Sequence, residues 1–174
     1  MNNTFRRNRQ TAEERVDCNE HTQYRSKRCF GGTTTPDRIL QTALAAWRQG
    51  NFVAAANQFN EQFTFTDHAL GLEFKDKGRL TEFLAKTREL FPDSGRKANT
   101  IFSSGDGVIS EWTLTATKTE PFWGRLVRKV EICVQGISVV QTKNGKISQW
   151  SDYYDQLQSR RNGLAAWFTE WLEL

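Results

Sequence analysis

The spacing of hydrophobic residues changes from a helical period to a strand period along this chain. In residues 36–59 and 80–91, apolar residues recur every three or four positions, which predicts helices. Between these segments, residues 62–67 alternate strictly between apolar and polar, which predicts a strand. Beyond them the period is two, with turns and one longer connection at 119–127, so we expect strands near 97–104, 107–118, 128–142 and 146–154.

This order of elements predicts the α+β class, with helices segregated against an antiparallel sheet. We expect one folded domain over residues 36–158. Residues 1–35 are polar and basic, which predicts a disordered leader. Residues 159–174 place apolar side chains at i, i+3, i+4, i+7 and i+8, so we expect a C-terminal amphipathic helix there.

The net charge of +4 lies mostly in the leader. Residues 1–35 hold seven Lys or Arg and four Asp or Glu, a balance of +3, which leaves +1 for the rest of the chain. A nearly neutral domain argues against a nucleic-acid partner. No apolar run reaches the roughly 20 residues that span a bilayer, and the basic N-terminus lacks the apolar stretch of a secretory signal. We therefore expect no membrane partner and a cytoplasmic location.

Neither a metal nor an organic cofactor is expected. Cys18, His21 and Cys29 lie close in the sequence, but no fourth ligand is near them. Their spacing also matches no common zinc site.

Two of the expected strands place an acid in a row of aromatic residues. Asp152, in the strand that follows the Asn144-Gly145 hairpin signal, shares a face with Trp150 and Tyr154. An unpaired, ionised carboxylate on a buried face would cost several kcal/mol, so it finds partners or shifts its pKa. Asp152 is therefore either a paired structural acid or an acid that lines a pocket and does chemistry.

The second acid is Asp67, which shares a face with Phe63 and Phe65 at the end of strand 62–67. It also stands at the start of a loop. It is therefore either a base in the same pocket or a turn residue that binds its own loop.

Four segments in this order, residues 45–51, 66–71, 90–93 and 144–155, resemble the SnoaL-like group of the nuclear transport factor 2-like superfamily. The resemblance implies a cone-shaped α+β barrel, with an apolar cavity between a curved antiparallel sheet and the N-terminal helices. It also implies a homodimer formed through the outer face of the sheet. It does not imply one function, because this superfold hosts isomerases, cyclases, dehydratases, epoxide hydrolases and non-enzymatic binding proteins.

For three known chemistries of this superfamily, the chain has one matching acid but lacks a second group that the chemistry needs. Trp150 and Asp152 match the Trp-x-Asp of limonene-epoxide hydrolases, but Trp112 and Leu114 stand where those enzymes carry Arg-x-Asp. Asp67 matches the base of steroid isomerases, whose oxyanion-hole tyrosine is missing here. Asp152 also matches the acid/base of SnoaL-type polyketide cyclases, without their histidine on the adjacent strand.

Our first hypothesis is an enzyme that performs acid/base proton transfer, as an isomerase, cyclase or lyase, on a small hydrophobic molecule. Asp152 would be the acid/base, and Asp67 a second proton acceptor or a group that orients the substrate. The alternative is a non-catalytic ligand-binding or assembly module of the same fold, and epoxide hydrolysis is a third reading. The expected lining of the pocket is Trp47, Phe63, Phe65, Trp112, Leu114, Trp150 and Tyr154.

Overall fold

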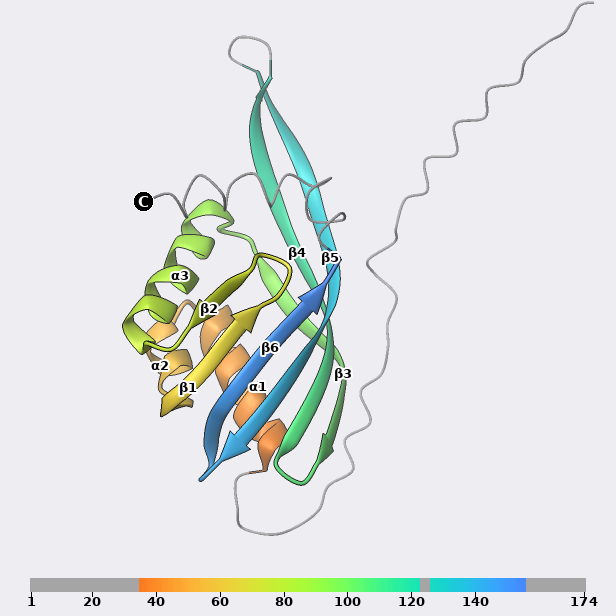
Figure 1. The fold of residues 1–174 in the computed structure, drawn as a ribbon. Helices are drawn as coiled ribbons and strands as arrows, with labels where there is room; N and C mark the ends of the chain where they lie inside the picture. The colour runs from red at the N-terminus through yellow and green to blue at the C-terminus, as the bar shows by residue number, and fades with distance from the viewer. Residues whose placement is uncertain (1–34, 123–125, 156–174) are drawn as a thin grey trace, which may run out of the picture.

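The structure of the protein, a computed structural model, describes residues 35–122 and 126–155 (Figure 1). In this part of the chain the elements follow the predicted order, with one short strand added after the first. The helices are α1 (Pro36–Arg48), α2 (Phe52–Ala56) and α3 (Lys77–Leu90). The strands are β1 (Phe59–Asp67), β2 (Leu72–Phe74), β3 (Gly95–Ser104), β4 (Gly107–Phe122), β5 (Leu126–Lys143) and β6 (Lys146–Tyr154).

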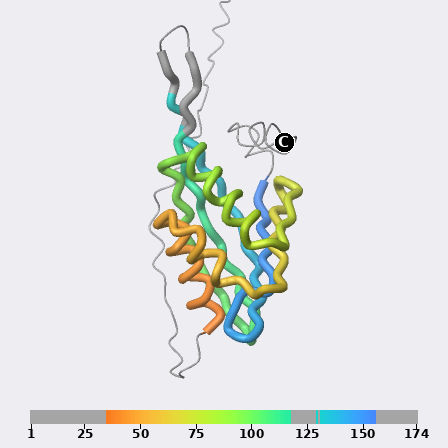
Figure 2. The backbone as a smooth tube through the Cα atoms, turned by 90° about the vertical axis from the view of Figure 1, so that its left-hand side faces the viewer, coloured from red at the N-terminus to blue at the C-terminus, as the bar shows by residue number. Residues whose placement is uncertain are grey.

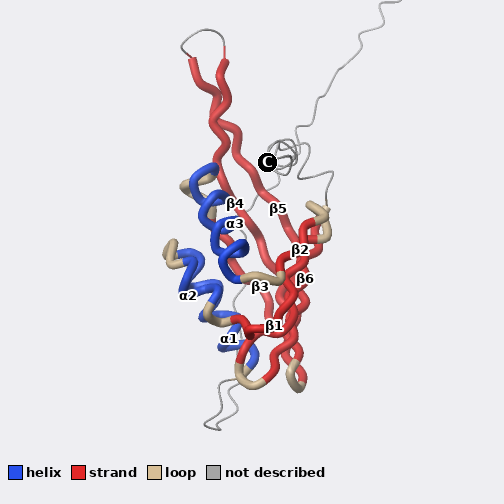
Figure 3. The backbone as a smooth tube through the Cα atoms, turned by 60° about the vertical axis from the view of Figure 1, so that its left-hand side comes forward, coloured by secondary structure: helices blue, strands red, loops and turns tan. Residues whose placement is uncertain are grey.

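The strands form one curved sheet in the order β2-β1-β6-β5-β4-β3, which stays open rather than closing into a full barrel. The predicted α+β class and the antiparallel meander from β3 to β6 are confirmed. One pairing differs from the expected antiparallel sheet, because β1 runs parallel to β6. The helices lie together on one face of this sheet, as the views in Figures 2 and 3 agree.

Two segments differ from the predicted boundaries. The loop expected after Asp67 contains β2, which pairs with β1 through Phe65 and Phe74. The expected connection 119–127 is mostly strand, because β4 continues to Phe122 and β5 begins at Leu126. This hairpin therefore extends beyond the rest of the sheet (Figure 1).

Local sequence signals account for several of the element ends. Asn51 and Asp76 cap α2 and α3, because each side-chain oxygen accepts the backbone N–H three residues later. At the β5–β6 turn, Asn144 and Gly145 both have positive φ, 54° and 74°, as the hairpin signal predicts.

Arg88 of α3 binds the C-terminal end of α1. Its Nη2 donates to the carbonyl oxygens of Trp47 at 3.3 Å and Arg48 at 2.9 Å, and its Nη1 donates to the carbonyl of Pro92 at 3.1 Å. A cation at this end of a helix also opposes the negative end of the helix dipole. The contact ties α3 to the C-terminal end of α1.

The core lies between the helices and the inner face of the sheet, and aromatic rings fill much of it. Trp150 is 1% exposed, and the Phe59 and Phe65 rings both lie 5.9 Å from its ring. Leu40 of α1 and Leu80 of α3 are also fully buried in this core. This packing holds β1 and β6 side by side, which brings their C-terminal ends together.

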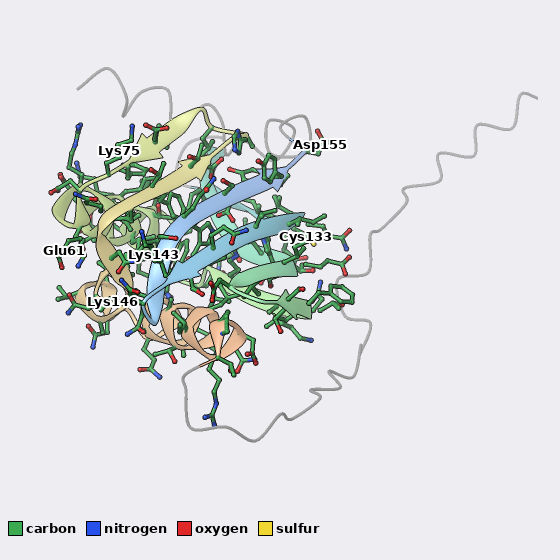
Figure 4. All side chains as sticks on the ribbon, turned by 60° about the horizontal axis from the view of Figure 1, so that its bottom comes forward. Glu61, Lys75, Cys133, Lys143, Lys146 and Asp155 are labelled. Carbon is green, nitrogen blue, oxygen red and sulfur yellow. The ribbon has the colours of Figure 1, made fainter. Side chains whose placement is uncertain are left out.

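The opposite face of the sheet exposes a group of large apolar side chains, which we call the outer sheet patch. Its members alternate along the strands with residues that point into the core. In Figure 4, β6 runs from the labelled Lys146 to Tyr154, just before the labelled Asp155. The outer sheet patch consists of Phe102, Ile109, Ile137 and Tyr153.

Several predictions concern residues outside the described ranges. These are the leader up to residue 34, the helix over 159–174, and Cys18, His21 and Cys29. Among the helices that the structure does describe, none has the length and apolar character needed to cross a membrane.

Candidate functional site

An apolar cavity of about 70 Å³ lies between the sheet and the helices α1 and α3. A single water needs roughly 10–15 Å³ in this measure, so the cavity has room for several waters or a small organic molecule. Seven of the nine residues predicted for the site line it, namely Trp47, Phe65, Asp67, Trp112, Leu114, Asp152 and Tyr154.

Phe63 and Trp150, the other two predicted residues, are not among the residues that line this cavity. Phe63 packs against Phe59, with ring centroids 4.9 Å apart. The Trp150 ring is packed between Phe59 and Phe65, and it borders a void of about 10 Å³, too small for a ligand. Strand parity predicted the face of these side chains correctly, but the cavity occupies only part of that face. Trp150 contributes instead through its indole N–H, which donates to Asp152 Oδ1 at 2.7 Å.

Asp152 is 3% exposed and its carboxylate accepts four hydrogen bonds. Arg96 approaches it with both terminal nitrogens, Nη1 to Oδ2 and Nη2 to Oδ1, each at 2.8 Å. Ser138 Oγ donates to Oδ1 at 2.6 Å, and Trp150 supplies the fourth bond. Bidentate pairing with a guanidinium is a strong form of charge-assisted hydrogen bond. Of the two readings open for Asp152, a paired acid or a pocket acid, the geometry therefore contains both: it is paired, and it borders the cavity.

Arg96 comes from β3, where its register partner on β4 is Leu114. Its guanidinium lies over the Trp112 ring at 4.0 Å, with Trp47 at 5.7 Å and Trp150 at 5.5 Å. Cation–π contacts of this kind strengthen when the cation is desolvated. A buried cation thus stands in the cavity wall although β4 carries Trp112 and Leu114 in place of an Arg-x-Asp.

Two residues of β5, Ser138 and Gly136, determine the position of the Trp112 ring next to Arg96. Ser138 is fully buried and its Oγ accepts from Trp112 Nε1 at 2.9 Å and from Arg96 Nη2. Gly136 leaves room for the indole, because a Cβ there would lie 2.6 Å from Trp112 Cη2 and 2.7 Å from the Tyr153 carbonyl oxygen. The position of the Trp112 ring therefore depends on the absence of a side chain on β5.

Asp67 is 6% exposed and has weaker partners than Asp152. Its Oδ1 accepts from the backbone N–H of Leu70 at 2.9 Å, and its Oδ2 accepts from the Tyr154 hydroxyl at 3.0 Å. Burial raises the pKa of Asp67 from 3.8 to about 6, although the two hydrogen bonds and the charge of Arg96 act to lower it. Burial and the Asp67 charge also raise the pKa of the Tyr154 hydroxyl, which stays protonated as a donor. Asp67 therefore binds its own loop, as one of its two readings predicted, and it also lines the cavity. Its role as a base stays a prediction.

The two acids are neighbours, because Asp67 and Asp152 are register partners on the parallel strands β1 and β6. With both ionised, the site carries two negative charges and the one positive charge of Arg96. Within the part of the chain that the structure describes, no group of three or more His, Cys, Asp or Glu side chains is placed to hold a metal ion. The arrangement suits proton transfer, since one acid is held firmly by a cation and the other titrates near neutrality.

Two of the three residues that bind the Asp152 carboxylate, Arg96 and Ser138, were not predicted to belong to the site. Arg96 lies one position before the strand expected at 97–104, so no prediction was made of the sheet face on which its side chain lies. Pairing the β3 and β4 segments in register would have placed Arg96 opposite Leu114, a residue already expected to point inward. The other available signal was Asp152 itself, because a buried and ionised carboxylate requires a positively charged partner.

A curved sheet wrapped partly around helices, with acids at an apolar cavity, defines the nuclear transport factor 2-like class of folds. The model of the SnoaL-like polyketide cyclase family matches residues 37–163. The chain belongs to this family.

Solved structures show the same fold at low sequence identity. A protein of Catenulispora acidiphila with a ketosteroid isomerase-like fold, in complex with trimethylamine, is 22% identical, with a TM-score of 0.57 over 70% of this chain and 88% of that one. A SnoaL-like protein of Jannaschia sp. is 14% identical, with a TM-score of 0.64 over 81% and 99%. TerC, co-crystallised with polyporic acid, is 13% identical, with a TM-score of 0.61 over 72% and 95%. Comparison with curated proteins found no match.

Proposed function

We propose that this protein is an enzyme that transfers a proton on a small hydrophobic substrate, with Asp67 as the group that takes up and returns the proton. The proposal rests on a difference in bonding between two neighbouring acids at one apolar cavity. Among residues 35–122 and 126–155, Asp152 accepts four hydrogen bonds and pairs with Arg96, whereas Asp67 accepts two and pairs with no cation. The sequence analysis had instead predicted Asp152 as the acid/base and Asp67 as the secondary group.

The hydrogen bonds at each carboxylate support this assignment. Three of the four donors to Asp152 converge on Oδ1, so a proton added to Asp152 would have to displace the guanidinium or another donor. Asp67 can accept a proton at the cost of one bond from Tyr154, whose hydroxyl can turn and accept instead. A pKa of about 6 leaves Asp67 mostly ionised at neutral pH and still able to hold a proton during a reaction.

The chemistry that fits is removal of a proton from carbon next to a carbonyl, followed by its return at a different atom. Return to another carbon is isomerisation, and loss or attack of a group elsewhere on the substrate is a lyase or cyclase reaction. A positioned acid/base contributes typically 10²–10⁴-fold to a rate, which is enough for such an activated C–H bond.

The test measures exchange of hydrogen for deuterium in D₂O by NMR, across a panel of small cyclic and aromatic ketones. The protein should speed exchange at the carbon next to the carbonyl, with kcat/KM falling as the pH drops below about 6 and Asp67 becomes protonated. Asp67→Asn should abolish the exchange. Asp106→Asn, which removes an exposed acid in the β3–β4 turn, should not change it. Exchange by the Asp67 variant at the normal rate would refute the role of Asp67.

The saturated bonding of Asp152 also favours a second candidate, a non-catalytic ligand-binding module that uses the same cavity. Such a protein would bind ketones from the panel, detected by quenching of tryptophan fluorescence, without exchanging their protons. Exchange that depends on Asp67 contradicts this candidate.

A further inference from the structure

Cys133, labelled in Figure 4, lies on the outer face of the sheet, away from the cavity. Its neighbours in β5, Ile132 and Val134, are 1% and 2% exposed in the core, so the side chain between them points the opposite way. Cys133 is half-buried there, and it is disulfide-bonded. A disulfide at this position requires a second cysteine on the outer face, with its Cα atom within about 7 Å.

The partner of Cys133 must come from the leader. The structure contains one copy of the chain, and the sequence has three cysteines, of which the other two are Cys18 and Cys29. Both precede Thr35, the first residue that the structure describes. Either pairing ties the leader to the face of the sheet that lies away from the helices.

The C-terminal end of α1 is level with Cys133 along the sheet. The Arg96 guanidinium lies 5.7 Å from the Trp47 ring, near the end of α1. Arg96 pairs with Leu114 on β4, and Leu114 pairs with Val134, the residue after Cys133. The start of α1 therefore lies further back, by about 18 Å at 1.5 Å per residue, toward the β3–β4 turn (Figure 1).

Chain length decides between the two leader cysteines. From Thr35 the chain must pass round the edge of β3 and reach β5, two strand spacings of about 4.8 Å away and one layer of about 10 Å deeper. Together with the 18 Å along the sheet, this path is roughly 30 Å long. The six residues from Cys29 to Thr35 span at most about 20 Å, and a disulfide adds about 6 Å between Cα atoms. The 17 residues from Cys18 span up to about 60 Å, so Cys18 can reach Cys133.

We infer that a disulfide between Cys18 and Cys133 straps the leader round the β3 edge to the outer face of the sheet, and that Cys29 keeps a free thiol. The strap passes β3, the last strand of the sheet, whose outer edge has no strand partner within the described residues. Such an edge otherwise offers a template for pairing with other chains. Cys133 lies four residues before Ile137 on β5, so the bond lies beside the outer sheet patch rather than over it.

The bond forms by oxidation of two thiols, and a small-molecule disulfide such as oxidised glutathione is the oxidant. One protein thiolate attacks a sulfur of that molecule, its S–S bond breaks, and one thiolate leaves with the electron pair; the other protein thiolate then displaces the second. Two protein thiols are oxidised to one disulfide, the oxidant is reduced to two thiols, and the two protons pass to these thiols. The strap therefore closes in an oxidising compartment and opens in a reducing cytosol.

The test is a peptide map of the full-length protein, equilibrated with reduced and oxidised glutathione. Free thiols are blocked with iodoacetamide, and the protein is digested with trypsin without reductant and analysed by mass spectrometry. Residues 16–25 should be released linked to residues 130–143, and residues 29–38 should appear alone with an alkylated cysteine. A link between 29–38 and 130–143, or between two copies of 130–143, would overturn the inference. So would alkylated or glutathione-bound Cys133.

Two serine variants give matched controls in the leader. Cys29→Ser should keep the link, whereas Cys18→Ser should lose it and leave Cys133 open to alkylation. Because the bond closes a loop of more than 100 residues, its reduction should lower Tm by roughly 5–15 °C in the unaltered protein and in Cys29→Ser. Reduction should not change the Tm of Cys18→Ser, and an equal fall in that variant would contradict the pairing.

Discussion

Asp67 should make the protein less stable at neutral pH than it would be with a neutral side chain at this position. Burial raises the pKa of Asp67 from 3.8 to about 6 in the folded protein. The folded state therefore holds this proton more tightly than the unfolded state. The stability that the protonated group contributes is fully present below pH 3.8 and is lost as the pH rises through about 6. At about 1.4 kcal/mol per pKa unit, the difference corresponds to about 3 kcal/mol above neutral pH.

Asp67→Asn should recover this free energy, because an amide imitates the protonated acid. Its oxygen can accept the N–H of Leu70, and its NH₂ can donate to the Tyr154 hydroxyl oxygen, so both hydrogen bonds have replacements. We expect the free energy of unfolding to rise by about 3 kcal/mol at about pH 8 and to stay nearly unchanged near pH 4. For a chain of this size the gain corresponds to roughly 6–12 °C in Tm.

The assay is urea unfolding of both proteins at the two pH values, so that every other titrating group cancels in the difference. Asp93→Asn is a control with the opposite sign, because hydrogen bonds from Thr117 lower the pKa of Asp93. That carboxylate contributes stability at high pH, which falls as the pH drops through its folded pKa, so the variant should lose stability at about pH 8 and not at low pH. Equal or lower stability of Asp67→Asn at about pH 8 would show that the pocket favours the ionised form, and the reasoning on Asp67 would be wrong.

Three further predictions follow from the same contacts. Tyr154→Phe removes a donor to the Asp67 carboxylate, so the pKa of Asp67 should rise above about 6 and the acid limb of the deuterium-exchange profile should move to higher pH. Gly136→Ala places a Cβ 2.6 Å from an indole carbon and should cost about 2 kcal/mol or more in urea unfolding, whereas Gly95→Ala, with its nearest atom at 3.9 Å, should change stability by less than about 0.5 kcal/mol. We also propose that the outer sheet patch forms the homodimer interface, so Ile137→Glu should convert a dimer to a monomer in analytical ultracentrifugation; an unchanged mass would place the interface elsewhere.

Residue patterns predicted the elements well because periodicity is a local property. The alternation around Asp152 and Asp67 correctly placed both side chains on the inner face, and the Asn144-Gly145 signal correctly located a hairpin. The parallel pairing of β1 with β6 could not be obtained in this way, because it depends on the strand order of the whole sheet. The short strand β2 was missed because three residues are too few to show a period.

The residues that form the site were harder to predict than the sheet face on which the site lies. Trp150 shares the face of Asp152 but fills the core, since the depth of a side chain depends on packing from the helices. Arg96 was missed because its contribution needs the register of β3 on β4, which shifts between Ala98 and Thr100. A register shift of this kind leaves no reliable mark in the sequence of one strand.

The pairing of Arg96 with Asp152 explains why the acid with the clearest sequence signal is the weaker test of function. Replacing Asp152 by Asn would leave a buried guanidinium without its counter-charge, and breaking such a pair typically costs about 3–5 kcal/mol. A loss of activity in that variant would therefore report damage to the pocket as readily as loss of a proton carrier. Asp67 has no such partner within the described part of the chain, and an amide can reproduce both of the hydrogen bonds seen there. A variant at Asp67 therefore changes the proton chemistry while keeping the cavity, and the two effects can be separated there.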